Sequence, residues 1–195
     1  MCMIGRMDGK GLILALAAAA LAGGCQPAGK VSLVQPQLAG WQREVRLQTD
    51  QVYWARAEGV DRILAEFPLP GARIGRPTYL LYLRLPAGVD KAALDPKADP
   101  KSRARGFIIQ TRGEYAGLAG LKSGEVQARS PSPLAPASKR LFRVDLKCED
   151  GTQIVGEMTA SRDDYLVSRF ETRQRPADVQ SLLRTNSAGA TSKPK

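Results

Sequence analysis

The sequence of 195 residues contains no histidine. Histidine is the commonest general base near neutral pH and a frequent metal ligand. Its absence excludes Ser-His-Asp and Cys-His catalysis, and it excludes zinc sites that depend on imidazole. The Gly-x-Ser-x-Gly motif of many hydrolases is absent as well. The sequence therefore predicts no catalytic triad, no metal site and no cofactor.

A long apolar run is also missing. The apolar run at residues 12–22 is too short for a membrane-spanning helix, which needs about 20 such residues. Arg6 and Lys10 precede the run, and small residues follow it up to Cys25. A positive start, a short apolar middle and a small-residue end are typical of a cleaved secretory signal.

The signal ends in "LAGGC", which resembles the lipobox of bacterial lipoproteins. The resemblance implies that a diacylglyceryl group is attached to the thiol of Cys25. It also implies cleavage of the Gly24–Cys25 bond and acylation of the new N-terminus, for example with palmitate. The family favours leucine three residues before the cysteine, where this sequence has Ala22. The alternative is an ordinary cleaved signal with an incidental cysteine.

The same resemblance implies a location. Several acyl chains hold a protein stably on a membrane, because each buried CH₂ contributes about 0.8 kcal/mol. Gln26 follows the cysteine, whereas Asp at that place retains enterobacterial lipoproteins in the inner membrane. The expectation is a lipoprotein anchored in the outer membrane of the cell envelope and facing the periplasm.

Acidic residues are scarce relative to basic ones. The chain has 29 Lys and Arg against 19 Asp and Glu, which gives a net charge of +10. Because an exported protein rarely meets nucleic acid, we expect no nucleic-acid partner. Anionic lipid headgroups, lipopolysaccharide phosphates and peptidoglycan carboxylates are the candidate partners, together with a protein of the cell envelope. A solvated basic surface without a ligand is the alternative.

Short alternating runs separated by Gly, Pro and Asp predict one antiparallel β-sandwich or barrel-like domain. We assign residues 1–24 to the signal, 25–38 to a lipidated leader and 39–175 to this β-rich domain. A short helix and a disordered tail are expected over 176–195, with the helix at 176–185. The candidate strands are 43–48, 51–57, 62–67, 78–85, 106–112, 124–130, 140–148 and 152–160.

The segment around "CEDGT" predicts a hairpin with a three-residue loop, Glu149-Asp150-Gly151. This loop places apolar residues of the two strands opposite one another, and burial of one face fixes the register of a hairpin. The expected pairs are Cys148 with Thr152, Leu146 with Ile154, Val144 with Gly156, Phe142 with Met158, Lys147 with Gln153 and Arg143 with Glu157. Cys148 is therefore expected to be a buried, unreactive thiol.

A second hairpin is expected over residues 52–67, with a four-residue loop at 58–61. That loop length places Val52, Trp54 and Arg56 opposite Phe67, Ala65 and Ile63, and it puts Trp54 in the core. The strand at 78–85 is apolar on both faces. It is therefore expected to be a central strand that lies under another layer.

A long charged connection runs from Pro86 to Gly106. Long connections in compact domains are often functional. We therefore take its basic residues as candidate contacts with an anionic surface, and a solvated connection is the alternative. The candidates are Lys97, Lys101, Arg103 and Arg105.

Without histidine, an enzyme would need paired carboxylates. Glu58, Asp61 and Glu66 cluster in the sequence, as do Asp163 and Asp164, but turns or a helix cap account for most of them. The expectation is a non-catalytic accessory or binding module of the cell envelope, tethered by lipid. A basic binder of peptidoglycan or lipopolysaccharide is the alternative, and a carboxylate-dependent hydrolase is the weakest one.

Overall fold

The computed structural model describes residues 27–36, 42–68, 79–95, 97, 103–112, 115–130 and 132–173. These residues form ten strands and one helix, α2. The strands are β1 (Gly29–Pro36), β2 (Gln42–Thr49), β3 (Val52–Ala57), β4 (Val60–Phe67), β5 (Tyr79–Pro86), β6 (Lys91–Ala93), β7 (Arg105–Arg112), β8 (Tyr115–Arg129), β9 (Lys139–Cys148) and β10 (Gln153–Arg162), and the helix is α2 (Asp164–Arg173).

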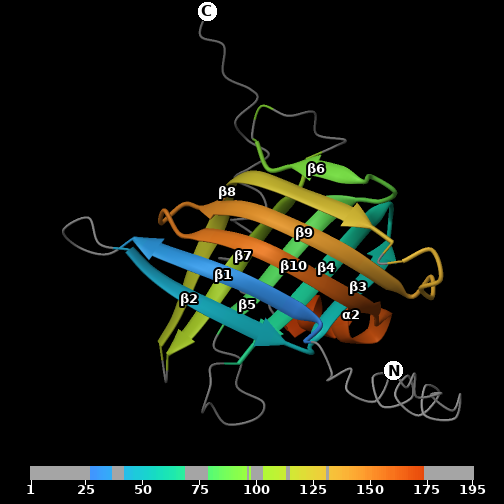
Figure 1. Ribbon diagram of the computed structural model, residues 1–195, viewed down its shortest axis with the longest axis horizontal. Coiled ribbons are helices and arrows are strands. Elements are labelled where there is room, and N and C mark those ends of the chain that lie inside the picture. The colour runs from blue at the N-terminus through green and yellow to red at the C-terminus, as the bar shows by residue number, and fades with distance from the viewer. Residues whose placement is uncertain are drawn as a thin grey trace, which may run out of the picture.

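Seven of these strands close into a barrel (Figure 1). The order around the barrel is β10-β3-β4-β5-β7-β8-β9, and β9 returns to β10. The pairings are antiparallel except that between β10 and β3, which is parallel. The β1–β2 hairpin extends the sheet from β10, and β6 is added to β8. The barrel alternative of the predicted fold is thus confirmed, with one parallel seam that the sequence did not indicate.

The barrel interior is the main core. Side chains alternate along each strand, so one set points inward and the next points out. In β9 and β10 the inward set includes Phe142, Leu146, Ile154 and Met158, which are all buried. Cys148 lies in the same core, as expected.

A second apolar cluster lies outside the barrel, beneath α2. Val167 of the helix packs among Leu64, Leu80, Tyr82 and Phe107 of the barrel wall. This cluster explains why β5 is apolar on both faces, and it confirms β5 as a central strand, paired with β4 and β7.

Helix α2 lies nearer the N-terminus than the expected helix. The expected one, at 176–185, is outside the described residues. Asp163 caps α2, because its Oδ1 accepts a hydrogen bond of 2.8 Å from the backbone N–H of Leu166. The sequence indicated a turn or cap at Asp163-Asp164 but not the helix that follows.

The β9–β10 hairpin has the predicted register. Leu146 pairs with Ile154 and Phe142 with Met158. Gly151 adopts φ 84°, a left-handed conformation that suits the last position of a three-residue loop.

The predicted register of the β3–β4 hairpin is wrong by two residues. Trp54 pairs with Ile63 and Arg56 with Asp61, around a two-residue loop. Glu58 and Gly59 form this loop with φ values of 53° and 72°, as a tight hairpin turn requires. The predicted loop includes Asp61, whereas Asp61 is a buried residue of strand β4.

Two further strand boundaries differ from the expectation. Residues 29–36, expected in the leader, form β1 and pair with both β10 and β2. Strand β8 begins at Tyr115 and not at Gly124, since its glycine-rich first half pairs with β7. From Leu121 onward β8 pairs with β9, and this second pairing has a register shift between Leu121 and Ser123.

Candidate anion-binding site

Three arginines form a row across the outer face of the barrel. Arg62 of β4 lies opposite Arg84 of β5, and Arg84 lies opposite Arg105 of β7. Neighbouring strands are about 4.8 Å apart, so the three side chains emerge side by side. Like charges at directly opposed positions destabilise a sheet. The row therefore needs compensation by negative charge.

At one end of the row, Arg62 lies beside two carboxylates. Glu171 of α2 forms an ion pair with Arg62, with 2.9 Å between Oε2 of the glutamate and Nη1 of the arginine. Oε2 of Glu58 lies 3.6 Å from Nη2 of the same arginine. The hydroxyl of Tyr82 donates a hydrogen bond to Glu171. Helix α2 thus neutralises Arg62 through Glu171.

The other two arginines of the row line a pocket. Together with Arg103, the side chains of Arg84 and Arg105 line a pocket of about 310 Å³. The remaining lining residues are Gly59, Val60, Leu85 and Pro86. The charged side chains among the described residues that line this pocket are all arginines. We call Arg84, Arg103 and Arg105 the arginine pocket.

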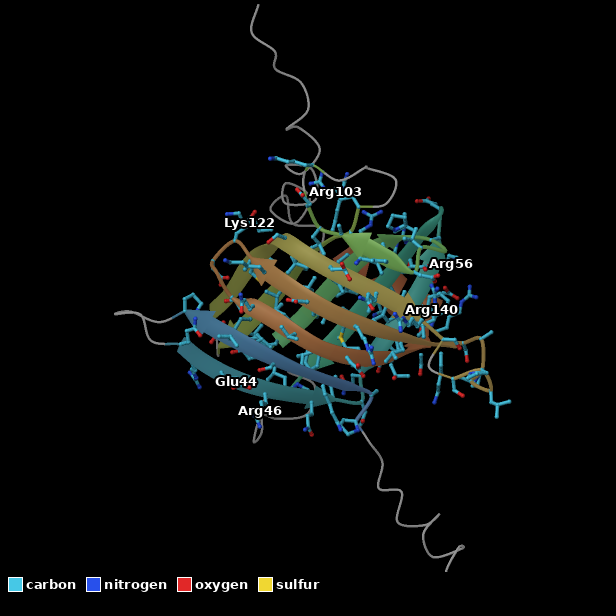
Figure 2. All side chains as sticks on the ribbon, turned by 45° about the horizontal axis from the view of Figure 1, so that its top comes forward. Glu44, Arg46, Arg56, Arg103, Lys122 and Arg140 are labelled. Atoms are coloured by element: carbon cyan, nitrogen blue, oxygen red, sulfur yellow. The ribbon has the colours of Figure 1, made fainter. Side chains whose placement is uncertain are left out.

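Burial and mutual repulsion act on the arginine pocket. Arg103, which is labelled in Figure 2, forms an isolated β-bridge with Ala93, the last residue of β6. This arginine is only 8% exposed. The pKa of Arg105 is lowered, first by partial burial and then by the positive charges of Arg103 and Arg84. The three guanidinium groups therefore lie close enough to repel one another, and an anion in the pocket would relieve this repulsion.

The structure brings together two of the four predicted basic contacts. Arg103 and Arg105 meet in the pocket, Lys97 is exposed in a turn beside Asp95, and Lys101 lies outside the described residues. Arg84 was missed because it stands in an apolar strand. The described parts of the 86–106 connection are not simply solvated, since Ala92, Leu94 and Ala104 belong to the core.

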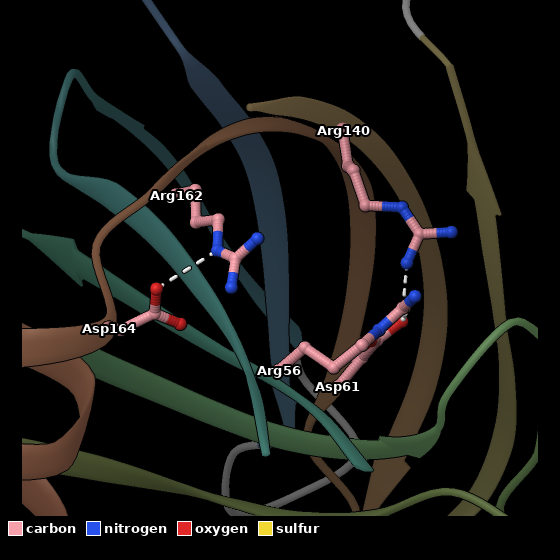
Figure 3. Close-up of polar contacts among 5 residues, drawn as sticks. All are labelled: Arg56, Asp61, Arg140, Arg162 and Asp164. Atoms are coloured by element: carbon pink, nitrogen blue, oxygen red, sulfur yellow. Dashed lines mark hydrogen bonds and ion pairs between the residues drawn. The ribbon is translucent and has the colours of Figure 1, made fainter. Parts of the chain in front are cut away.

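A second basic cluster lies around Trp54, and Figure 3 shows its three arginines together with Asp61 and Asp164. The guanidinium carbons of Arg140, Arg162 and Arg56 lie 5.3, 5.6 and 5.9 Å from the centre of the Trp54 ring. Such distances permit cation–π attraction. The indole Nε1 donates a hydrogen bond of 2.8 Å to the carbonyl of Ser138. Trp54 is thus a core residue, as expected, and three guanidinium groups lie near its ring.

Carboxylates already occupy this second cluster. Both carboxylate oxygens of Asp61 accept hydrogen bonds from Arg56, at 2.5 and 2.8 Å, and Arg140 also donates to one of them. Asp164 forms an ion pair with Arg162, with 2.9 Å between Oδ2 of the aspartate and Nε of the arginine. These two carboxylates therefore neutralise much of the positive charge of the cluster around Trp54.

A smaller pocket of about 130 Å³ lies near the turn at Asp150. Leu33, Tyr79 and Ile108 contribute apolar walls. The side-chain amide of Gln35 donates a hydrogen bond of 3.3 Å to Gln110 within it. This pocket combines apolar and neutral groups with one carboxylate, and it has no convergence of charge.

The carboxylates considered for hydrolysis have other partners. Asp61 is held by two arginines, Asp163 caps α2, and Asp164 pairs with Arg162. Burial raises the pKa of Glu66. Within the described part of the chain, no group of His, Cys, Asp or Glu is arranged to hold a metal ion.

The predicted lipidation and cleavage residues, Cys25 and Gly24, lie outside the described residues. The one helix of the described chain is too short to cross a membrane.

Comparison with known proteins found no match for the chain among family models, curated proteins or solved structures.

Proposed function

We propose that this chain is a lipid-tethered lipoprotein of the bacterial envelope whose barrel is a non-catalytic module that binds an anionic group. The ligand chemistry is a phosphate or carboxylate carried by an envelope lipid or glycan. The arginine pocket is the observation that carries the proposal, because Arg84, Arg103 and Arg105 converge on one pocket from neighbouring segments.

Burial favours this proposal over a merely solvated basic surface. Surface arginines that serve only solubility keep their charged ends in water. Arg103 is almost fully buried, and partial burial lowers the pKa of Arg105. Guanidinium groups suit phosphate and carboxylate because they present several donors in a rigid plane.

Strand addition by a protein partner is the second candidate, and β2 is the edge that could accept it. In the described sheet, β2 pairs only with β1. However, the exposed side chains of β2 include Arg43, Glu44 and Arg46, of which Figure 2 labels the last two. Charged side chains on an edge strand discourage pairing with other chains. The accessory-subunit alternative therefore has less support than the anion site.

The experiment measures binding of the full, lipidated protein, purified in detergent, to two anionic materials. One arm uses purified peptidoglycan sacculi, whose charge is carboxylate, and the other uses lipopolysaccharide, whose charge includes phosphate. An Arg84→Gln/Arg105→Gln double variant is compared with the unaltered protein in each arm. We expect at least about tenfold weaker binding in one arm, since two charge-assisted hydrogen bonds exceed 1.4 kcal/mol.

The matched control is an Arg43→Gln/Arg46→Gln double variant, which removes the same charge from the exposed edge strand β2. We expect this control to bind within about twofold of the unaltered protein, because screened surface charges contribute little. Equal losses in the two double variants would reduce the effect to net charge and overturn the site. Absence of binding to both materials would overturn the proposed function.

A further inference from the structure

We propose that the barrel sits directly on the membrane surface and contacts it through the loop at 132–138 and the start of α2. Leu134 and Tyr165 are the side chains that enter the lipid interface. We call these two elements the membrane-facing surface. The inference rests on the proposed lipidation of Cys25, and it adds an orientation that lipidation alone does not give.

The tether is too short for the barrel to move away from the membrane. Only Gln26 and Pro27 separate Cys25 from Ala28. Three residue steps span at most about 11 Å of extended chain. Ala28 is already fixed to the barrel, because its carbonyl accepts a hydrogen bond of 2.6 Å from Thr159 and its N–H donates to Asp50 at 3.3 Å.

The point of attachment selects one end of the molecule. From Thr159, strand β10 continues to Arg162, about 10 Å further on at 3.3 Å per residue. There the N–H of Arg162 donates to the carbonyl of Ser138 at 2.8 Å, and α2 begins immediately after Asp163. In Figure 1 the start of β1, the loop between β8 and β9, and α2 all lie toward the right of the view.

This end presents the two most exposed large apolar side chains of the described chain. Leu134 is 95% exposed and Tyr165 is 73% exposed. Leu134 is held outward by an ordered loop, since Ala135 N–H donates to Ser132 at 3.0 Å and Lys139 N–H donates to Pro136 at 2.9 Å. Tyrosine favours the boundary between lipid and water, where its ring is buried and its hydroxyl is hydrated.

Exposed basic residues border the loop that carries Leu134. Lys139 and Arg129 are exposed at the two ends of the loop, whereas Arg162, which is about half exposed, is paired with Asp164 at the start of α2. Each basic residue near an anionic membrane surface contributes about 1 kcal/mol of attraction. Apolar tips with a basic border are the features by which a protein lies on a lipid surface.

The test places a fluorescent label at three positions of the full, lipidated chain. The variants are Leu134→Cys, Tyr165→Cys and, as control, Leu118→Cys. Leu118 is a large apolar residue that is also exposed, at 37%, but it belongs to the 130 Å³ pocket near Asp150. The lipidated Cys25 and the buried Cys148 leave the introduced cysteine as the reactive thiol.

Each labelled protein is reconstituted into vesicles of phosphatidylethanolamine and phosphatidylglycerol, with and without a nitroxide on the lipid headgroup. We expect labels at positions 134 and 165 to lose fluorescence about twofold with nitroxide, because interfacial groups sit within about 5–10 Å of the headgroups. The label at position 118 should change little. Equal quenching at all three positions, or none at 134 and 165, would overturn the orientation.

Vesicle flotation separates this outcome from failure of the proposed function. If the protein does not float with the vesicles, the tether is wrong and the orientation falls with it. If it floats but the labels at 134 and 165 stay unquenched, only the orientation is wrong. Binding at the arginine pocket is measured separately and does not depend on either result.

Discussion

Burial at a single residue explains why Cys148 should be chemically inert. Its thiol is buried in the barrel, and burial raises its pKa to about 12, with smaller contributions from Asp150 and Glu149. The thiolate is the reactive form of cysteine. We therefore expect no reaction with a disulfide reagent at pH 8 in the folded protein and complete reaction in urea. Rapid reaction of the folded protein would contradict this.

The same raised pKa gives a pH dependence of stability. The ordinary pKa of cysteine is 9.0, so the folded chain holds the Cys148 proton more tightly than the unfolded chain does. The stabilisation from this group is complete below pH 9 and decreases as the pH rises from 9 to about 12. Urea unfolding at several alkaline pH values should show a smaller decrease for Cys148→Ala than for the unaltered protein. Parallel curves would contradict the assignment.

Asp61 is the residue whose loss should be most costly among the charged groups. The side chain of Asp61 is 2% exposed, and its carboxylate pairs with both Arg56 and Arg140 beside the Trp54 ring. Removing one partner of a buried ion pair typically costs about 3–5 kcal/mol. We expect Asp61→Ala to lower the free energy of unfolding by about 3 kcal/mol, because Arg56 is partly solvated and loses less.

Asp164→Ala is the matched control for Asp61→Ala. Its ion pair with Arg162 is about half exposed, so we expect a change below about 1 kcal/mol. Urea titrations followed by tryptophan fluorescence measure both variants. Similar losses in the two would show that the Asp61 pair is worth no more than a surface pair.

At the scale of elements, the two hairpins show what a sequence can and cannot fix. The β9–β10 register was predictable because every alternate residue is apolar and only one loop length pairs Phe142 with Met158. The β3–β4 register was not, because its last inward pair is Arg56 with Asp61. In a sequence, charged residues such as Arg56 and Asp61 indicate a turn. In the fold they stay in strands because Asp61 is buried and hydrogen-bonded to Arg56 and Arg140.

Helix α2 is stabilised by its packing and not by its sequence alone. Its segment has few apolar residues, yet the ring of Phe170 packs at a tilt of 38° against that of Tyr82, with ring centres 5.4 Å apart. We expect Phe170→Ala to lower the free energy of unfolding by about 2–3 kcal/mol, below the usual cost because the ring is only partly buried. Tyr165→Ala, which alters an exposed residue, should change it by less than about 0.5 kcal/mol. Equal effects would show that α2 does not cover the barrel wall.

The arginine row should act against stability, as binding sites often do. Arg84 faces Arg62 on one side and Arg105 on the other. Replacing one of several like charges at opposed positions gains about 0.5 kcal/mol. We therefore expect Arg84→Gln to raise the melting temperature while it weakens anion binding, whereas Arg43→Gln changes neither. A lower melting temperature for Arg84→Gln would indicate a structural role.

At the scale of the whole molecule, the sequence indicated the charge of the site but not its shape. Arg103 and Arg105 stand in a visibly basic segment, and excess positive charge is readable from composition. Arg84 stands among leucines and tyrosines, and it joins the site only because β5 pairs with β7. Pairing between distant strands depends on barrel closure, which no local pattern encodes.

Barrel closure itself depends on the shortest pairing of the ring. Strand β9 pairs with β10 from Gln153 to Ser161, whereas β10 pairs with β3 only at Ser161–Tyr53 and Arg162–Trp54. Two further hydrogen bonds reinforce the pairing between β10 and β3. The indole N–H of Trp54 donates to the carbonyl of Ser138, and the backbone carbonyl of Trp54 accepts a hydrogen bond of 2.9 Å from the N–H of Asp163. Local opening begins where few interactions must break together.

We therefore expect backbone amides at the β10–β3 seam to exchange with deuterium faster than those in the middle of β9 and β10. Trp54→Phe keeps an apolar ring but removes the hydrogen bond to Ser138, so it should accelerate exchange at Asp163 and Arg162. A typical hydrogen bond contributes about 1 kcal/mol, which corresponds to roughly fivefold faster exchange. The amide of Leu146, far along β9, should be unaffected. Uniform acceleration across β9 and β10 would mean that the barrel opens as one unit and that the seam is not its weak point.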